Sequence, residues 1–508
     1  MQRLLRSAVL FASFLLATEA FATTYYVDCA AGSDASSGTS QSSPWLHQPY
    51  MQGWSGTYTH TAGDQFIFKG GVTCPKSYFS LVPAHGGASG NPDYYGVDKT
   101  WYTGSAWTRP IWDLGGTSEI DSTNAVVNLE THQPSNITFD NFEIKGFYWS
   151  GSYQYHANSI FLAAVNITNI VIENIYLHGW AHGGTSDGMT LVKGYNQGNA
   201  NAGSVLSNCT IDGSDGDSVS GEAVYNWPLV HDCVIRDMSN GIVGTNEILY
   251  NNIIYNIHQS FDSADHENTI ETWLPLNDSV QTQYIYNNVI HDCDAAVQPL
   301  YVNPGGANNN GRTAYVYNNL VYNCVWGPPL LQDSECLGSV SCQPSQETLY
   351  YYNNTVVAPQ SNNACMRVVN RGNGNIGTMV FENNHCISQV GIFGYDSGIS
   401  INNLTQTTNT LMNSSTANSQ GYTAGNSYRP TSSTGATVGA GTNLASLCTG
   451  SLSELCNDVS GVLGLTTTGT GVPRPATGAW DTGAFEQSGG TGNAAPAAPT
   501  GLKVVSVQ

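Results

Sequence analysis

The ionisable side chains that could carry chemistry gather between residues 178 and 294. The densest group is Asp265-His266-Glu267, with Glu271 four residues further on. Carboxylates beside a histidine are typical of general acid–base catalysis, and they also bind metal ions. A solvated loop with local hydrogen bonds would use the same residues. The sequence therefore leaves two interpretations open, a catalytic or metal-binding cluster and an ordinary polar loop.

Three further carboxylates, Asp212, Asp215 and Asp217, are separated only by glycine and serine. Oxygen ligands spaced this closely suit Ca²⁺, a hard cation that takes several of them. The spacing lacks the regular ligand positions and the final glutamate of an EF-hand loop, and a simple Asp/Gly turn is the alternative. A calcium site at these three residues is a hypothesis from the sequence.

Basic residues are scarce in the same stretch, where Lys193 and Arg236 are the only two. A lyase that removes a proton next to a uronate carboxylate needs a base and positive charge, so Arg236 is a candidate catalytic residue. A surface ion pair between Arg236 and Asp237 is the alternative. Trp180, Trp227 and Trp273 lie nearby and could stack on sugar rings.

A short repeat indicates which elements position these residues. Two or three apolar residues, a polar residue and Asn recur at intervals of 19 to 36 residues. A short strand, a polar turn and another strand in each copy predict the coils of a parallel β-helix, whose Asn side chains form a ladder. A β-sandwich or a propeller is the alternative, although a propeller would show a regular period. The predicted column contains residues 141, 174, 209, 233, 252, 288, 319, 354 and 384.

Twelve cysteines support this register. Cys209 and Cys233 share the column, and Cys293 and Cys324 each lie five residues beyond it. Equivalent positions in adjacent coils are about 4.8 Å apart, within the range of a disulfide, so both pairs are predicted bridges. Local candidates and the remaining cysteines give four more pairs: Cys336–Cys342, Cys448–Cys456, Cys29–Cys74 and Cys365–Cys386.

Composition excludes several classes of protein. The 508 residues include 15 Lys and Arg against 37 Asp and Glu, a net charge of −22, and 55 Gly and 20 Pro. Nucleic-acid binding needs a basic surface that this chain lacks, and Gly and Pro exclude a coiled coil. The charge would repel polyanions, which favours a neutral or weakly acidic glycan, or a calcium-dependent lyase.

The ends of the chain indicate export. Residues 1–22 read as a signal peptide, with Arg3 and Arg6, an apolar run and Ala20-Phe21-Ala22, and a membrane anchor is the alternative. We expect a secreted, extracellular or periplasmic monomer without a membrane span. Residues 23–125 are predicted as an N-terminal cap and first coils, 126–410 as coils, and 411–487 as a last irregular coil and C-terminal cap. Residues 488–508 read as a linker followed by the first strand of a fibronectin-III-like module.

Two segments carry a family resemblance. Tyr25-Tyr26-Val27-Asp28 with Pro44-Trp45, and the closing 480–486 segment Trp-Asp-Thr-Gly-Ala-Phe-Glu, resemble secreted bacterial proteins of the pectin-lyase-like superfamily. The resemblance covers about residues 24–487 and implies an all-β, right-handed parallel β-helix. It also implies a polysaccharide-active enzyme, either a lyase or a glycoside hydrolase. A non-catalytic glycan-binding protein or a structural protein of the cell surface is the alternative, because one fold hosts many functions.

A looser resemblance concerns Asp187. Residues 185–188 and 213–217 resemble the aspartate motifs of polygalacturonase-type hydrolases, which implies catalytic roles for Asp187, Asp215 and Asp217. The chain departs from that pattern because Thr185 replaces an asparagine and Gly216 splits an aspartate pair. These departures put the implied roles in doubt.

Overall fold

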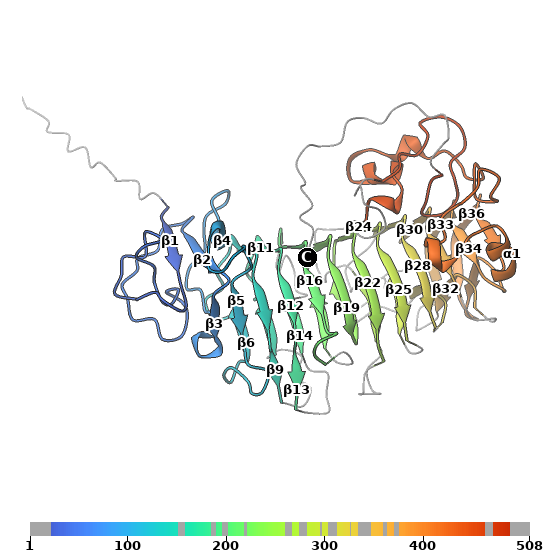
Figure 1. Ribbon diagram of the computed structural model, residues 1–508. Helices are drawn as coiled ribbons and strands as arrows, with labels where there is room; N and C mark the ends of the chain where they lie inside the picture. Colours follow the sequence, from blue (N-terminus) through green and yellow to red (C-terminus); the bar gives the residue numbers. More distant parts are fainter. Residues whose placement is uncertain are drawn as a thin grey trace, which may run out of the picture.

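The chain winds through repeated coils of three short strands, as the computed structural model in Figure 1 shows. The structure describes residues 22–150, 158–183, 189–195, 202–217, 221–259, 267–273, 282–294, 297–302, 312–325, 327–333, 347–358, 363–369, 375–462 and 471–487. Each coil adds one strand to each of three parallel sheets, here called A, B and C. The protein is therefore a parallel β-helix, as the sequence predicts, while the hand of the coil stays a prediction.

Every strand of these sheets pairs in parallel with the equivalent strand of the next coil. Sheet A contains, in order, β1 (Thr24–Val27), β2 (Gln65–Gly70), β4 (Asp93–Tyr102), β7 (Ile137–Asp140), β11 (Ile170–Glu173), β15 (Val205–Ser207), β18 (Leu229–His231), β21 (Ile248–Tyr250), β24 (Thr282–Tyr286), β27 (Thr313–Tyr317), β30 (Thr348–Tyr352), β33 (Asn375–Glu382) and β36 (Ser400–Thr407). Sheet B contains β3 (Thr73–Pro75), β5 (Ile111–Asp113), β8 (Glu143–Lys145), β12 (Tyr176–His178), β16 (Thr210–Asp212), β19 (Val234–Met238), β22 (Ile253–Ile257), β25 (Val289–Cys293), β28 (Leu320–Cys324), β31 (Thr355–Val357), β34 (His385–Ile387) and β37 (Thr410–Met412). Sheet C contains β6 (Ala125–Asn128), β10 (Ser159–Leu162), β14 (Thr190–Lys193), β17 (Glu222–Tyr225), β20 (Asn240–Thr245), β23 (Asn268–Trp273), β26 (Gln298–Val302), β29 (Leu330–Asp333), β32 (Met366–Val369) and β35 (Phe393–Tyr395). A separate pair joins β9 (Tyr148–Trp149) to β13 (Ala181–His182).

The predicted asparagine ladder lies at the turn between sheets A and B. Each side-chain amide donates to the side-chain oxygen of the next coil at 2.9–3.0 Å. The ladder consists of Asn252, Asn288, Asn319, Asn354, Asn384 and Asn409. The residue before each ladder position has a positive φ, between 49° and 59° from Asn251 to Thr408, a conformation that asparagine tolerates well. The ladder therefore satisfies buried polar groups at the tightest corner of each coil.

The predicted register is wrong by one residue in its first two copies. Strand pairing places Asn141 and Asn174 in the positive-φ position, level with Asn208 and Asp232. The ladder position itself is occupied there by Phe142 and Ile175, which are buried. An asparagine can serve either position, so the sequence alone did not separate the two columns.

Cys209 and Cys233 occupy the ladder position in adjacent coils, but they form no disulfide, so this predicted bridge is wrong. The Cys209 thiol donates to the carbonyl of Ser207 at 3.1 Å, and the Cys233 thiol donates to that of His231 at 3.3 Å. The two side chains thus point at backbone carbonyls, much as the ladder amides do. Equal register brings the two residues close, but it does not by itself join their sulfurs.

The other predicted disulfides within the described residues are confirmed. Cys293 pairs with Cys324 in adjacent coils, with a Cα–Cα distance of 4.3 Å. The remaining bridges are Cys29–Cys74, Cys365–Cys386 and Cys448–Cys456. Cys336 and Cys342 lie outside the described residues, as do residues 1–21 of the predicted signal peptide and residues 488–508 of the predicted linker. No helix of the described residues is long and apolar enough to cross a membrane.

The core is built from columns of inward side chains. On sheet B the column runs from Ile144 through Leu177 and Ile211 to Val356, and all of these are at most 1% exposed. At the N-terminal end, Phe66 of β2 is fully buried beneath Tyr25 and Tyr58. The segment between β1 and β2 therefore closes this end of the solenoid.

The C-terminal segment, residues 413–487, packs on the outside of the later coils. It contains α1 (Ser414–Ser419) and the 3₁₀ turns η3 (Ala424–Asn426), η4 (Ala445–Leu447), η5 (Gly450–Cys456) and η6 (Val459–Gly461). Leu444, Leu455 and Trp480 cover tyrosines of sheet A, and Val459 and Phe485 cover sheet B. In Figure 1 this orange-to-red segment rises above the coils around β24 and β30.

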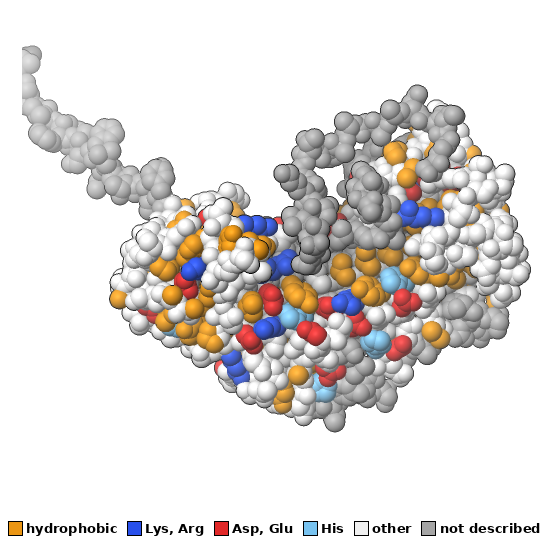
Figure 2. All heavy atoms as spheres, viewed as in Figure 1, with side chains coloured by type: hydrophobic (Ala, Val, Ile, Leu, Met, Phe, Trp, Pro, Cys, Tyr) orange, Lys and Arg blue, Asp and Glu red, His pale blue; other side chains and the backbone are white. Residues whose placement is uncertain are grey.

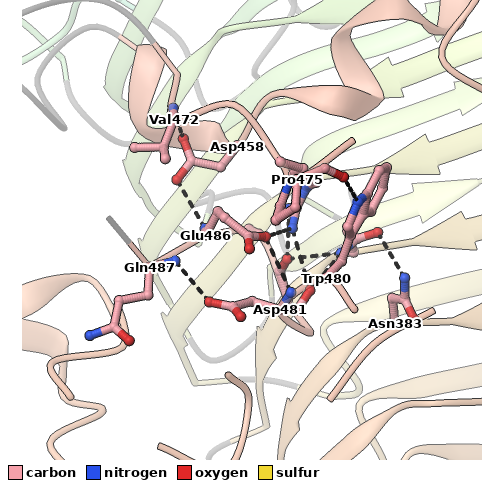
Figure 3. Close-up of polar contacts among 12 residues, drawn as sticks. Asn383, Asp458, Val472, Pro475, Trp480, Asp481, Glu486 and Gln487 are labelled. Atoms are coloured by element: carbon pink, nitrogen blue, oxygen red, sulfur yellow. Dashed lines mark hydrogen bonds and ion pairs between the residues drawn. The ribbon is translucent and has the colours of Figure 1, made fainter. Parts of the chain in front are cut away.

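One buried arginine fastens this segment to the asparagine turn. Arg474 donates to Glu486 Oε2 at 3.0 Å, to Asn318 Oδ1 at 3.1 Å and to the Gly483 carbonyl at 3.0 Å. Figure 3 shows Glu486 and Asp481 beside Trp480, whose Nε1 donates to the Pro475 carbonyl at 2.7 Å. The 480–486 motif of the sequence therefore has a structural role, which is to hold the C-terminal segment on the coils.

Candidate functional site

The outer face of sheet B carries a continuous row of ionisable and aromatic side chains. Strand pairing places one residue of each coil level with the next, at the strand spacing of about 4.8 Å. This row, here called the B-ladder, consists of Asp113, Lys145, His178, Asp212, Arg236, Tyr255, His291 and Tyr322. Figure 2 shows basic, acidic and histidine side chains gathered on the face formed by these strands.

His178 is the most elaborately held residue of the B-ladder. Its Nδ1 lies 2.7 Å from Asp215 Oδ2, and its Nε2 lies 3.3 Å from Glu143 Oε1. The Tyr176 ring stacks on the imidazole with 4.2 Å between the ring centroids. Partial burial disfavours the charged imidazolium, but the hydrogen bonds to Glu143 and Asp215 outweigh it and raise the pKa of His178 above 6.5.

The loop after β16 brings Asp215 to His178. Gly179 has a φ of +65°, and its N–H donates to Asp215 Oδ1 at 2.9 Å. The Asp215 side chain is 52% exposed, whereas that of His178 is 12% exposed. A molecule bound on this face would therefore meet the Asp215 carboxylate first, with the His178 imidazole directly behind it.

Arg236 forms the second charged group of the B-ladder. Its guanidinium pairs with Asp212, and its Nη1 lies 3.2 Å from Asp237 Oδ2. Burial works against ionisation of Asp212, but hydrogen bonds from Ser214 and the charge of Arg236 hold the pKa of that carboxyl below its usual value. Arg236 is thus a fixed cation held between carboxylates, which suits binding and orientation rather than proton removal.

The three aspartates expected to bind calcium pair with three different side chains. Asp212 pairs with Arg236, Asp215 with His178, and Asp217 with His182 at 2.6 Å. Within the ranges that the structure describes, no group of three or more metal-ligating side chains converges. The calcium site therefore stays a prediction.

The expected catalytic residues separate onto two faces. Arg236 lies on sheet B, while Glu271 lies on β23 of sheet C, where it is 7% exposed and accepts from Asn268 Nδ2 at 2.7 Å. Glu267, just before β23, is 1% exposed. Asp187, Asp265 and His266 fall outside the described residues. The structure thus does not bring Arg236 together with the Glu267–Glu271 group.

Sheet C carries a further buried ionisable side chain, three strands away from Glu271. Lys193 of β14 is 1% exposed, and burial lowers its pKa to about 8 although Glu222 and Glu130 oppose this shift. Its Nζ lies 5.1 Å from the centre of the Tyr225 ring. A lysine with this pKa could act as a base near neutral pH, but its burial keeps it from a ligand in this conformation.

The B-ladder becomes aromatic toward the C-terminal coils. The rings of Tyr255, His291 and Tyr322 stack with centroid distances of 4.9 and 5.0 Å. Tyr428 of the C-terminal segment then packs edge-on against Tyr322 at 5.6 Å. This contact marks where the C-terminal segment begins to cover the B-ladder.

Sequence reasoning missed most of this row, including Glu143, His178 and His291 as site residues. A usable signal existed, because every B-ladder residue from Lys145 to Tyr322 lies four residues after the positive-φ position of its coil. The expected sugar-stacking role of Trp180 and Trp227 is wrong, since both side chains are fully buried.

Comparison with known proteins adds a likeness of fold. No protein-family profile and no curated protein matches the chain. Among solved structures, a rhamnogalacturonan lyase is 17% identical with a TM-score of 0.40, covering 76% of this chain and 87% of that one. The pectate lyase Pel9A is 13% identical with a TM-score of 0.35, covering 92% and 97%. A GH136 lacto-N-biosidase from Eubacterium ramulus is 15% identical with a TM-score of 0.33, covering 77% and 68%. Likeness at this level assigns no activity to this chain.

Proposed function

We propose that the protein is a secreted polysaccharide-active enzyme that binds its glycan along the B-ladder. The observation that carries the proposal is His178, whose imidazole lies between Glu143 and the exposed Asp215 on the outer face of sheet B. The hydrogen bonds to these carboxylates raise the pKa of His178, which favours the protonated form that can serve as a proton donor. The Cys29–Cys74 disulfide and the other three suit a secreted chain.

In this proposal the two halves of the B-ladder have different tasks. The aromatic half, Tyr255 to Tyr322, would contact the glycan through the ring edges of Tyr255 and His291, because the ring faces stack on one another and Tyr322 is only 9% exposed. In the charged half, protonated His178 gives its Nδ1 proton to the leaving oxygen through the Asp215 carboxylate, so that His178 becomes neutral and Asp215 ends as the carboxylate it was at the start. Glu143 holds the other imidazole nitrogen, and Arg236 orients hydroxyl or carboxylate groups of the substrate.

These roles favour hydrolysis over β-elimination on this face. Elimination needs a base, yet His178 has a raised pKa and Arg236 is a permanent cation. Hydrolysis needs an acid and a second carboxylate, which the group around His178 contains. The excess of carboxylates over cations on this face, with the net charge of −22, favours a neutral or weakly acidic glycan.

The test is a turnover screen with matched variants. The purified chain is incubated with a panel of polysaccharides, with Ca²⁺ or with chelator, while reducing ends and absorbance at about 235 nm, where an unsaturated uronate absorbs, are recorded together. We expect new reducing ends without absorbance. His178→Gln should lower kcat by roughly 100-fold or more, the usual size of a general-acid contribution. The control His291→Gln alters the aromatic half and should change KM more than kcat.

The screen also decides between this proposal and its alternatives. A rise in both signals would mean elimination, and its loss with chelator would implicate calcium. The stacked rings of Tyr255, His291 and Tyr322, without the charged half of the B-ladder, would favour a non-catalytic glycan-binding protein. Retention on an immobilised glycan that His291→Gln weakens, without turnover of that glycan, would support the binding protein and contradict the enzyme.

A further inference from the structure

The last coil of the solenoid leaves its inward side chains uncovered. Leu411 of β37 continues the inward column of Val356 and Cys386, which are each 1% exposed, yet Leu411 is 47% exposed. Leu404 of β36 likewise follows the fully buried Met379 and is 38% exposed. Seven large apolar side chains are exposed among the described residues. Four of them lie on this coil: Leu404, Leu411, Val390 and Tyr395.

The strand edges of the same coil are also open. β35, β36 and β37 are the outermost strands of sheets C, A and B, and no strand of the described residues pairs with their far edges. Proteins usually protect such edges with charged residues or proline. Here residues 397–428 contain neither charge nor proline. This surface, residues 390–412 with their outer edges, is called the open end below.

The opposite end of the solenoid cannot serve as its partner. Phe66, the inward residue of an early coil, is fully buried, and Trp45 and Tyr25 stack above it with 4.4 Å between their ring centroids. The first strand edge is thus covered by aromatic packing. Head-to-tail stacking of copies would require the N-terminal end and the C-terminal end of the solenoid both to be open. Among the described residues, only the C-terminal end is open.

We propose that the open end binds the open end of a second copy of this chain, forming a two-fold dimer of solenoids. Such a contact pairs β36 with its copy in antiparallel fashion and buries Leu404 and Leu411 of both chains. The dimer uses the open end of both chains and leaves only the covered N-terminal ends free, so no third copy can add to it. The 23 residues of the open end match the 20–30 residues a side of an interface of about standard size.

The open end is the surface on which two copies can meet without charge repulsion. Two chains of net charge −22 repel each other over most of their surfaces. The uncharged stretch 397–428 is a surface on which two such chains can meet without that repulsion. Asp396, the nearest carboxylate, is already paired with Arg367 through hydrogen bonds of Nε and Nη2 to its Oδ1.

The test measures mass and shape in solution. Sedimentation equilibrium of the full secreted chain at roughly 1–100 µM should give twice the mass of one chain, with a dissociation constant in or below this range. Small-angle scattering should show a particle almost twice as long as one solenoid. The double variant Leu404→Lys/Leu411→Lys should weaken association by about 100-fold or more, since like charges would then face each other.

The control is Leu447→Lys, which places the same charge on a leucine 36% exposed in the C-terminal segment. It should leave the dimer intact, and equal urea midpoints would show that all variants fold. A monomer at the highest concentration would overturn the proposal. So would a dimer that survives the double substitution, or growth into species larger than a dimer.

Discussion

Arg474 is predicted to hold the C-terminal segment on the coils. Its side chain is fully buried and donates to Glu486, Asn318, Gly483 and, at 3.3 Å, to the carbonyl of Asp481. Arg474→Ala would leave a nearly buried carboxylate and three oxygen acceptors without this donor. Removing one partner of such a buried pair costs about 3–5 kcal/mol.

We expect this cost to appear as local opening of residues 413–487, because the asparagine ladder and the core columns do not involve Arg474. Hydrogen exchange measures it directly. The amide of Gly441, bonded to Trp480 O at 2.8 Å, and that of Val459, bonded to Ala484 O at 2.9 Å, report on the closed segment. Their exchange should accelerate by roughly two to three and a half orders of magnitude, since about 1.4 kcal/mol corresponds to a factor of ten.

The effect of Arg474→Ala on hydrogen exchange should depend on pH. Burial raises the pKa of Glu486 to about 7, so protonation can neutralise it when Arg474 is absent. The defect of Arg474→Ala should therefore be larger at pH 8.5 than at pH 5. Arg367→Ala is the control, because its ion pair with Asp396 is half exposed and such pairs contribute about 0–1 kcal/mol. Exchange rates within twofold of the parent at pH 8.5 would refute the reasoning.

Three further predictions concern the coils and the B-ladder. The pKa of His178 is raised in the folded chain, so its stabilising contribution is complete below about pH 6.5 and is lost as the pH rises through the folded pKa. The difference in Tm between the parent and His178→Gln should therefore shrink as the pH rises. A difference that does not change with pH would contradict the ion pairs. Asn319→Ala removes the acceptor of the Asn288 amides, at 3.0 Å each, and should cost about 3 kcal/mol in urea unfolding. The control Asn166→Ala, which removes one exposed hydrogen bond to Gln133, should cost under about 1 kcal/mol. Cys209 and Cys233 should react with iodoacetamide only after denaturation, and mass spectrometry that finds them joined would restore the predicted disulfide.

The fold was predictable because its signal is periodic. Ladder asparagines such as Asn288 and Asn319 recur in six successive coils from Asn252 to Asn409, and cysteines such as Cys293 and Cys324 follow the same register. The failures have a common origin in side-chain direction. Strand pairing sets which Cα atoms are neighbours, but it does not decide whether the Cys209 and Cys233 side chains bond to each other or to backbone carbonyls.

The candidate site was only partly predictable for the same reason. Arg236 and Asp212 were recognised separately, but their pairing depends on adjacent coils that are 24 residues apart in sequence. Glu271 appeared close to them in sequence and lies on another sheet. The open end was missed because residues 411–487 were expected to close it, whereas Leu411 stays exposed.

The measurement that tests the central claim most directly is turnover by the parent chain and by His178→Gln and His291→Gln on the same glycan panel. The account predicts reducing ends released by the parent, a kcat lowered by about 100-fold or more in His178→Gln, and a mainly altered KM in His291→Gln. Turnover that is unchanged in His178→Gln would contradict the assignment of catalysis to the B-ladder.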